Sequence, residues 1–190
     1  MTQNPLITTE RLLMRPLSPD DAEAILRYRS DPVINRHQGW IPSTIQDVID
    51  FIETRISSTI DIADTWYQFV LIRKDTGELI GDVGLHFFDA ALKQVELGCS
   101  IDKNYQGNGF ATEALREAMH YVFVKLDKQR IVASVDPRNS KSIALIERLG
   151  LKKEAHYKER FQIRGEWVDD VIYAIQKEDW MNNRREPSNH

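Results

Sequence analysis

Gln106-Gly107-Asn108-Gly109-Phe110-Ala111 lies between a predicted strand that ends near Ile101 and the most regular helical pattern of the chain. Its two glycines allow a sharp backbone turn and a close approach to a ligand. The helix behind them presents unpaired N–H groups and the positive end of its dipole, which suit a phosphate or pyrophosphate group. A glycine-rich connection without a ligand is the alternative, and it would be favoured for an isolated Gly-x-Gly. The strand–turn–helix context favours an anion-binding turn.

This turn differs from the two commonest nucleotide-binding motifs. It lacks the Gly-Lys-Ser/Thr ending of a P-loop. It also lacks the third glycine of a dinucleotide-binding fingerprint, and no opening strand and turn begins the chain. Both motifs are therefore excluded.

The helix behind the turn is the clearest element of the chain. Between Gly109 and Leu126, apolar residues recur at helical spacing and define one face, formed by Ala111, Ala114, Leu115, Ala118, Val122 and Phe123. Upstream, the patterns predict a strand at Arg11–Leu17, helices that begin at Ser18 and at a Ser43/Gln46 cap, and strands at Trp66–Ile72, Leu79–Phe88 and Gln94–Ile101. Downstream, they predict a strand at Arg130–Val135, a helix at Ser140–Leu149, and strands at Glu154–Ile163 and Trp167–Ile175.

This order of elements indicates an α/β fold of the α+β type, with a largely antiparallel first half. No repeat or Gly/Ser-rich linker divides the chain, so we expect one domain over residues 1–180 and a polar tail over 181–190. The net charge of −4 argues against a nucleic-acid partner. A single cysteine excludes an internal disulfide framework, and the five histidines show no spacing for a metal site. Without a secretory signal or a long apolar stretch, we expect a cytoplasmic protein that does not enter membranes.

Several motifs together resemble those of a known family. Gln106-x-x-Gly109-x-Ala111 is similar to the acetyl-CoA motif, Arg/Gln-x-x-Gly-x-Gly/Ala, of the GNAT N-acetyltransferase superfamily. The segments 95–98 and 136–151 resemble the central strand and the second conserved block of that family, and residues 9–17 resemble its RimJ/RimL-type branch of ribosomal-protein acetyltransferases. The resemblance implies a mixed, mostly antiparallel central sheet, flanked by helices and with splayed central strands. It also implies acetyl-CoA as co-substrate, with no metal.

The resemblance assigns the expected cofactor contacts residue by residue. Backbone groups of β-strand residues would pair with the pantetheine arm, and backbone N–H groups of the turn would hold the pyrophosphate. The expected cofactor-binding residues are Cys99, Ser100, Ile101, Gln106, Gly107, Asn108, Gly109, Phe110, Ala111, Asn139 and Ser142. Judged from its residue type alone, Asn139 is equally well explained as an ordinary turn asparagine.

Two residues are candidates for proton chemistry. Glu96 alternates with apolar neighbours on its strand, and burial would bring its pKa toward neutrality, as a general base requires. A solvent-facing strand glutamate is the alternative, and many relatives relay the proton through water. The family often has a tyrosine seven residues after Asn139 as the acid toward the leaving thiolate, but this chain has Ile146 there. Ser142 matches a serine proposed for this role in RimL-like relatives, although it fits a helix surface equally well.

The acceptor side is less defined. Specificity should come from residues 31–42 and from the 160–167 hairpin, with His37, Trp40 and Arg160 as expected substrate contacts. A hydrophobic lid on the second helix explains the 37–40 cluster equally well. The sequence therefore predicts acetyl transfer to a primary amine, either a protein N-terminus or a small molecule, by a monomer or homodimer. The alternative is a non-catalytic acyl-CoA-binding or sensing protein.

Overall fold

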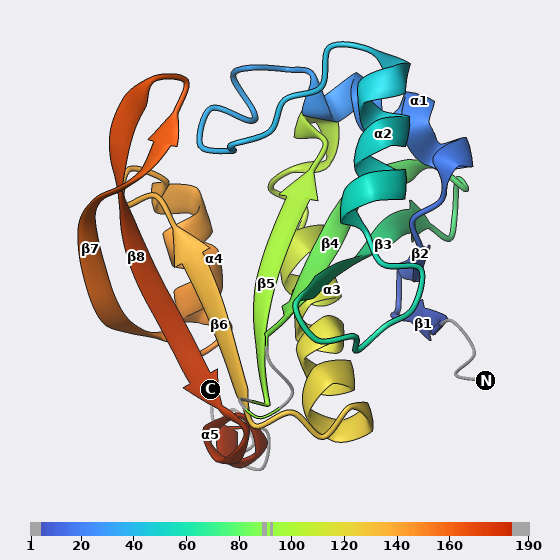
Figure 1. The fold of residues 1–190 in the computed structure, drawn as a ribbon. Coiled ribbons are helices and arrows are strands. Elements are labelled where there is room, and N and C mark those ends of the chain that lie inside the picture. Colours follow the sequence, from blue (N-terminus) through green and yellow to red (C-terminus); the bar gives the residue numbers. More distant parts are fainter. Residues whose placement is uncertain (1–4, 89–90, 92, 184–190) are drawn as a thin grey trace.

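The computed structural model describes residues 5–88, 91 and 93–183. Within them, one eight-stranded mixed sheet has the order β1-β2-β3-β4-β5-β6-β8-β7 (Figure 1). The strands are β1 Ile7–Thr8, β2 Leu12–Pro16, β3 Thr65–Arg73, β4 Leu79–Phe87, β5 Gln94–Ile101, β6 Arg130–Val135, β7 Lys152–Ile163 and β8 Glu166–Gln176. The helices are α1 Ala22–Arg29, α2 Ile45–Arg55, α3 Phe110–His120, α4 Ser140–Arg148 and α5 Lys177–Asn183. The mixed, mostly antiparallel sheet that we predicted is confirmed.

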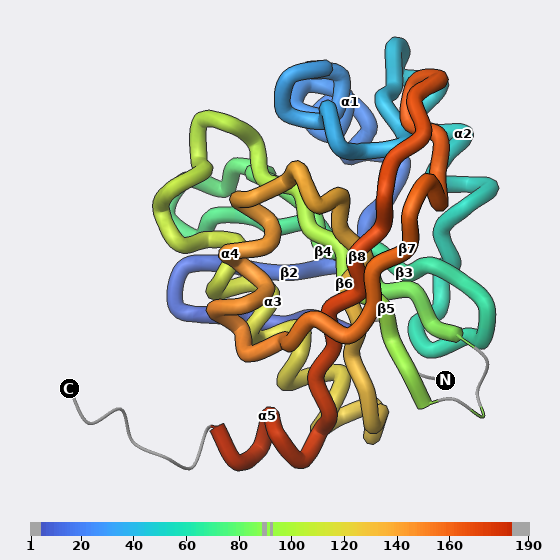
Figure 2. The backbone as a smooth tube through the Cα atoms, turned by 90° about the vertical axis from the view of Figure 1, so that its left-hand side faces the viewer, coloured from blue at the N-terminus to red at the C-terminus, as the bar shows by residue number. Residues whose placement is uncertain are grey.

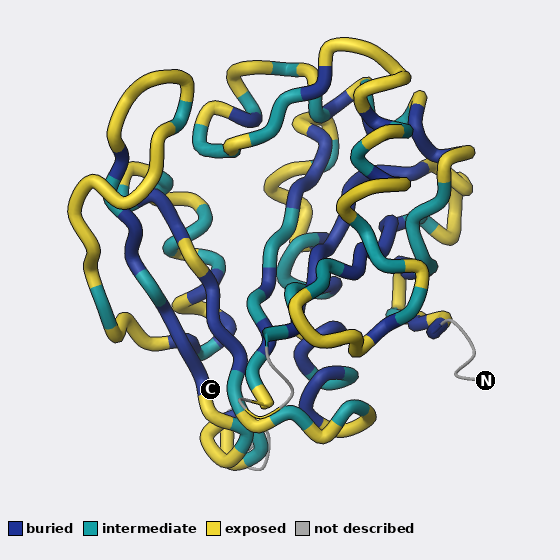
Figure 3. The backbone as a smooth tube through the Cα atoms, in the orientation of Figure 1, coloured by how far each residue is buried: buried dark blue, intermediate teal, exposed yellow. Residues whose placement is uncertain are grey.

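The helices cover the two faces of this sheet. Figure 2, turned by 90°, places α3 and α4 on the side of the sheet opposite α2. Val70 and Leu71, neighbours on β3, point to opposite faces, so Val70 packs with α1 and α2 while Leu71 belongs to the core with α3 and α4. The central strands are accordingly buried, whereas the edge strand β7 is largely exposed (Figure 3).

The start of α2 lies one residue from the predicted cap. Thr44 is the N-cap: its side chain accepts a hydrogen bond from the Asp47 N–H, and the Asp47 carboxylate accepts one from the Thr44 N–H. The predicted Ser43/Gln46 pair has the same spacing, but the charged carboxylate of Asp47 is the stronger acceptor and also binds the Ser43 N–H at 2.8 Å.

Two helical segments differ from their predicted bounds. The long helix after the turn ends as α3 at His120 and continues as a π-helix at Tyr121–Lys125. The predicted tail begins too early, because α5 extends to Asn183 and buries Trp180 beside Phe123. One buried aromatic in seven residues gives too little periodicity to predict such a helix. The rest of the predicted tail, residues 184–190, lies outside the described residues.

The central strands separate along their length, as predicted. β5 and β6 are the parallel pair, and their register covers Gln94↔Arg130, Val95↔Ile131 and Glu96↔Val132 only. Beyond Glu96, β5 continues along β4 to Ile101, while β6 continues along β8. Figure 1 shows the two strands diverging toward the end of the molecule that carries the loop between α1 and α2. This divergence opens the sheet directly beyond Glu96.

Candidate active site

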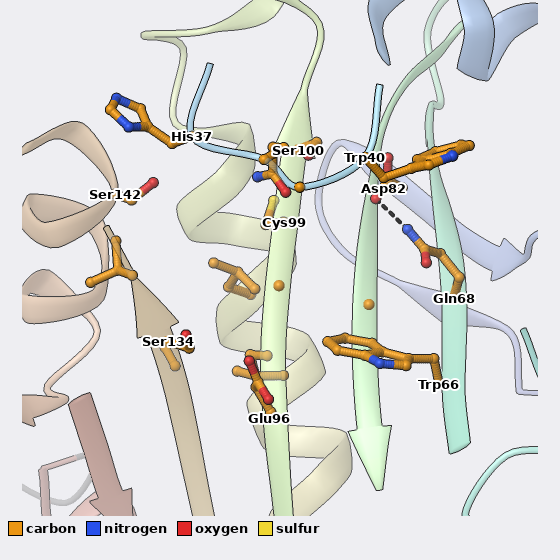
Figure 4. A pocket seen from close by; sticks show the side chains of 18 of the residues that line it. His37, Trp40, Trp66, Gln68, Asp82, Glu96, Cys99, Ser100, Ser134 and Ser142 are labelled. Carbon is orange, nitrogen blue, oxygen red and sulfur yellow. Dashed lines mark hydrogen bonds between the residues drawn. The ribbon is translucent and has the colours of Figure 1, made fainter. Parts of the chain in front are cut away.

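A cavity of about 1010 Å³ lies between the diverging strands β5 and β6. Trp40, Phe51 and Trp66 line it on the side of α2. Leu115 of α3 and Ser142 and Leu145 of α4 line it as well, and these helices lie on the opposite face of the sheet. The cavity thus passes through the sheet at the divergence and joins its two faces (Figure 4).

The glycine turn follows β5 and is shaped for an anion, although none of residues 106–111 lines the cavity. Gly107 and Gly109 have φ angles of 79° and 83°, in the left-handed region that favours glycine. The Gln106 side chain donates a hydrogen bond to the Ile101 carbonyl at 3.0 Å and fixes the turn to the end of β5. The Glu113 N–H is bonded to the Gly109 carbonyl at 3.0 Å, whereas N–H groups in the first turn of a helix have no acceptor within that helix. The backbone is therefore suited to a pyrophosphate at residues 107–111.

Arg11 supports the turn from the other end of the sequence. It donates to the Glu113 carboxylate at 2.7 Å and to the Asn108 carbonyl at 3.0 Å, and its guanidinium lies 4.3 Å from the Phe110 ring centroid. Burial acts to raise the pKa of Glu113, but hydrogen bonds from Thr9 and Arg11 outweigh it and lower that pKa. No local pattern in residues 9–17 predicts these contacts, because Arg11 and Glu113 are 102 residues apart in sequence.

Glu96 occupies the last paired position before the strands diverge. Its side chain is 24% exposed and points into the cavity (Figure 4). Burial, together with the nearby charge of Asp170, raises the pKa of Glu96 to about 7, although Arg160 opposes this shift. At neutral pH this carboxyl is therefore poised both to accept and to release a proton.

Asp170 and Arg160 influence Glu96 from the closing hairpin. Asp170 is buried on β8, accepts a hydrogen bond from Ser134 Oγ at 2.6 Å, and has Arg160 Nε 3.7 Å from its Oδ2. The predicted substrate contact Arg160 does not line the cavity; it is 44% exposed and stacks over Tyr157. Its connection to the site is electrostatic, through Asp170 and Glu96.

The predicted cofactor residues at the end of β5 lie in two different settings. Cys99 and Ser100 line the cavity from β5, whereas Ile101 is buried in the core and its carbonyl already accepts the Gln106 bond. Burial, with the nearby charge of Asp82, raises the pKa of Cys99 to about 12, so this cysteine remains a thiol at neutral pH.

On α4, Asn139 and Ser142 both line the cavity at the start of the helix. The Asn139 side chain is the N-cap and accepts a hydrogen bond from the Ser142 N–H at 3.2 Å. Figure 4 shows the Ser142 hydroxyl turned toward β5. Ile146, one turn further on, also lines the cavity and is buried.

The predicted acceptor residues His37 and Trp40 lie at the cavity. His37 Nδ1 is 2.9 Å from Asp136 Oδ2, which connects the loop between α1 and α2 to the end of β6. Burial acts to raise the pKa of Asp136, but hydrogen bonds from Arg138 and His37 outweigh it and hold that pKa well below its usual range. Trp40 stacks on Phe51 with 4.1 Å between ring centroids. The loop is thereby attached to both walls of the cavity.

A buried polar network forms part of the cavity wall, where Arg29, Gln68 and Asp82 line it. The Asp82 carboxylate, 1% exposed, accepts hydrogen bonds from Tyr28, Arg29 and Gln68. Figure 4 shows the Gln68 bond. Because Arg29 is the counter-ion of Asp82, the two buried charges offset one another. No spacing in the sequence joins residues of α1, β3 and β4 in this way.

Among the described residues, no helix is long and apolar enough to cross a membrane. In the same part of the chain, no group of three or more His, Cys, Asp or Glu side chains is placed to hold a metal ion.

Known proteins resemble this chain over most of its length. An uncharacterised N-acetyltransferase of Bacillus licheniformis is 30% identical over 173 residues, which cover 90% of this chain and 96% of that protein. The [ribosomal protein uS5]-alanine N-acetyltransferase of Escherichia coli is 29% identical, with 94% of each chain covered. The structure of spermidine N-acetyltransferase from Vibrio cholerae with CoA and spermine has a TM-score of 0.78 and 25% identity, covering 90% of this chain and 99% of that one.

The family model described as acetyltransferase (GNAT) domain matches residues 11–152. This match includes the glycine turn, Glu96 and the Asn139 cap, and it ends where β7 begins. The resemblance seen in the sequence motifs is confirmed: the chain belongs to the GNAT acetyltransferase family and is an N-acetyltransferase.

Proposed function

We propose that this protein transfers the acetyl group of acetyl-CoA to a primary amine that enters the cavity beneath the loop between α1 and α2. The observation that carries the proposal is the cavity itself, which joins the turn side of the sheet to the Glu96 side. The acceptor is a protein N-terminus or a small-molecule amine. The Escherichia coli relative, named for an alanine of a ribosomal protein, supports the first of these two.

The donor side would be held by backbone groups. The N–H groups of residues 107–111 would bind the pyrophosphate, because the two glycines with positive φ expose them at the start of α3. Cys99 and Ser100 would lie along the pantetheine arm, since both line the cavity from β5. Bound acetyl-CoA supplies an acetyl group activated as a thioester.

Glu96 would act as the general base. The amine forms a C–N bond as the C–S bond of the thioester breaks, and it must lose a proton in the process. A carboxyl with a pKa of about 7 is ionised to a useful fraction at neutral pH and accepts that proton, directly or through a water molecule. Asp170 and Arg160 would tune this pKa without touching the substrate.

Ser142 would act on the leaving-group side. Its hydroxyl faces β5 at the N-terminal end of α4, where the helix dipole favours negative charge. A thiolate that departs there would be stabilised by this end of the helix and by a hydrogen bond from Ser142. Ile146 has no proton to donate, so Ser142 or water would replace the tyrosine that is common in the family.

The test is release of free thiol from acetyl-CoA when the purified protein is offered a panel of primary amines and N-terminally free peptides. Thiol release in step with amine consumption would support the proposal. Binding of CoA without thiol release across the panel would favour the alternative of a non-catalytic acyl-CoA sensor. Absence of CoA binding would refute both.

A further inference from the structure

On the α2 side of the cavity, five residues form what we call the acceptor slot: Trp40, Phe51, Trp66, Gly84 and Gly98. The stacked Trp40–Phe51 pair forms one wall, with an interplanar angle of 17°. Trp66 forms the other and is itself stacked on His86. Figure 4 shows the Trp66 ring lying across β4, and in the sheet register His86 lies between Trp66 and Glu96.

The floor of the slot is backbone without side chains. Gly84 of β4 and Gly98 of β5 are direct partners in the antiparallel register, so both lack a side chain at the same point of one sheet face. A Cβ at Gly84 would approach the Trp66 ring to 3.1 Å, which shows that the ring packs directly on the strand. A Cβ at Gly98 would meet nothing within 4 Å and would project into open space. The open part of the floor is therefore at Gly98, next to the Trp66 ring that covers Gly84.

Two of the four carboxylates that line the cavity, Asp82 and Asp136, are already compensated, which leaves Glu96 and Asp64. Asp82 is paired with Arg29, and Asp136 is bonded to Arg138 and His37. Asp64, whose side chain is 96% exposed, lies at the rim. A polyamine would need several carboxylates free to bind its additional ammonium groups. The cavity instead offers Glu96 for one amine and an apolar, flat surface next to it.

We propose that the acceptor slot binds the aromatic group of a primary monoamine, as found in arylalkylamines and in peptides with an aromatic first residue. This inference rests on the acetyl transfer proposed above and adds the class of acceptor. The ring would lie over Gly98, beside the Trp66 ring that covers Gly84, with the amino group directed to Glu96. Ring-on-ring contact and exclusion of water would supply the selectivity.

The test compares amines of matched chemistry. Phenethylamine should exceed ethanolamine and spermidine in kcat/KM by roughly tenfold or more, because the site discriminates through buried apolar area. The peptides Phe-Ala-Gly and Ser-Ala-Gly, compared in the same way, distinguish a peptide source from a small-molecule source. Spermidine or ethanolamine equal to or better than phenethylamine, with no preference for the Phe peptide, would overturn the proposal.

Gly98→Val fills the slot without straining the strand, since its Cβ meets no atom and valine suits a strand. It should lower kcat/KM for phenethylamine by roughly tenfold while ethanolamine changes by less than about twofold. Trp66→Ala should act in the same direction, and Trp167→Ala, at a 58% exposed tryptophan on β8, is the matched control. If Gly98→Val lowered kcat/KM equally for phenethylamine and ethanolamine, the proposal that the slot binds an aromatic group would be wrong.

A binding measurement separates the two proposals. Phenethylamine should bind the CoA-saturated protein in titration calorimetry, and Gly98→Val should abolish that binding while CoA still binds. If phenethylamine bound but no amine were acetylated, the slot would stand as an aromatic binding site and the proposed function would be refuted. Acetyl transfer to other amines, with no binding of phenethylamine, would retain the function and refute the slot.

Discussion

Replacing Glu96 with glutamine removes the proposed general base at the divergence of β5 and β6 and leaves the shape of the side chain almost unchanged. The folded protein holds the pKa of this carboxyl at about 7, against an ordinary value of 4.5. With a pKa of about 7, roughly one-tenth of the carboxyl is ionised at pH 6 and roughly nine-tenths at pH 8. The base should therefore become about nine times more available over these two pH units.

The activity assay uses the ratio of wild-type to Glu96→Gln kcat/KM. This ratio cancels the titration of the amine, which affects both proteins alike. It should rise about ninefold from pH 6 to pH 8 and reach about 100-fold or more, the usual lower range for general-base catalysis. Glu23→Gln, on the exposed face of α1, is the control. The ratio of wild-type to Glu23→Gln kcat/KM should stay near one at every pH. A ratio that stays constant across this range would refute the assignment of Glu96 as base.

The same pKa also predicts a change in stability. Because the folded state binds the proton more tightly than the unfolded state, the free energy of unfolding falls as pH rises from 4.5 to about 7. Ionising Glu96 in the folded state therefore lowers the free energy of unfolding by at most about 3 kcal/mol. This penalty is present in full above pH 7 and is absent below pH 4.5. Glutamine lacks this penalty, so Glu96→Gln should gain stability over the wild type at pH 8.

Urea unfolding at pH 8 and at pH 4.5 measures this difference. The midpoint of Glu96→Gln should lie about 1 M above that of the wild type at pH 8, and the gap should close at pH 4.5. An equal gap at both pH values would show that the folded state does not raise the pKa of Glu96.

Three further substitutions, the first with Gly77→Ala as its matched control, test other parts of the site. Gly109→Ala and Gly77→Ala place a side chain at φ angles of 83° and 73°, and each should cost about 1 to 2 kcal/mol in thermal or urea unfolding. Only Gly109→Ala should also weaken CoA binding in calorimetry; equal CoA affinity in the two variants would contradict the phosphate role of the turn. Asp82→Asn leaves the Arg29 charge uncompensated and should destabilise the fold by about 3 kcal/mol or more in urea unfolding, and a loss under 1 kcal/mol would argue against the buried pair. Ser142→Ala should lower kcat roughly tenfold or more with little change in the amine KM, and an unchanged kcat would leave Ser142 as a helix residue without a chemical role.

Local patterns predicted the parts of this protein that depend on neighbouring residues. The two glycines at 107 and 109 require positive φ angles wherever the chain folds, and the apolar spacing after Gly109 gives a helix with one buried face. The strand alternation around Glu96 likewise predicted a side chain opposite to its apolar neighbours. These properties follow from backbone sterics and from the period of each element, so they are visible in a short window of sequence.

The properties that set the chemistry depend on residues distant in the chain. The pKa of Glu96 is set by its burial and by Asp170, and the Arg11–Glu113 hydrogen bonds that support the turn join residues 102 apart in sequence. Arg160 was expected at the substrate and instead lies beside Asp170, because the register of the β7–β8 hairpin turns it there.

The sequence by itself therefore determined the glycine turn and the class of fold, since both arise from local backbone geometry. The opening between β5 and β6 arises only when β6 leaves β5 after Glu96 and follows β8. Tertiary structure alone decided which side chains face that opening and how their charges are compensated. Burial and electrostatics act through space, and no spacing along the chain encodes them.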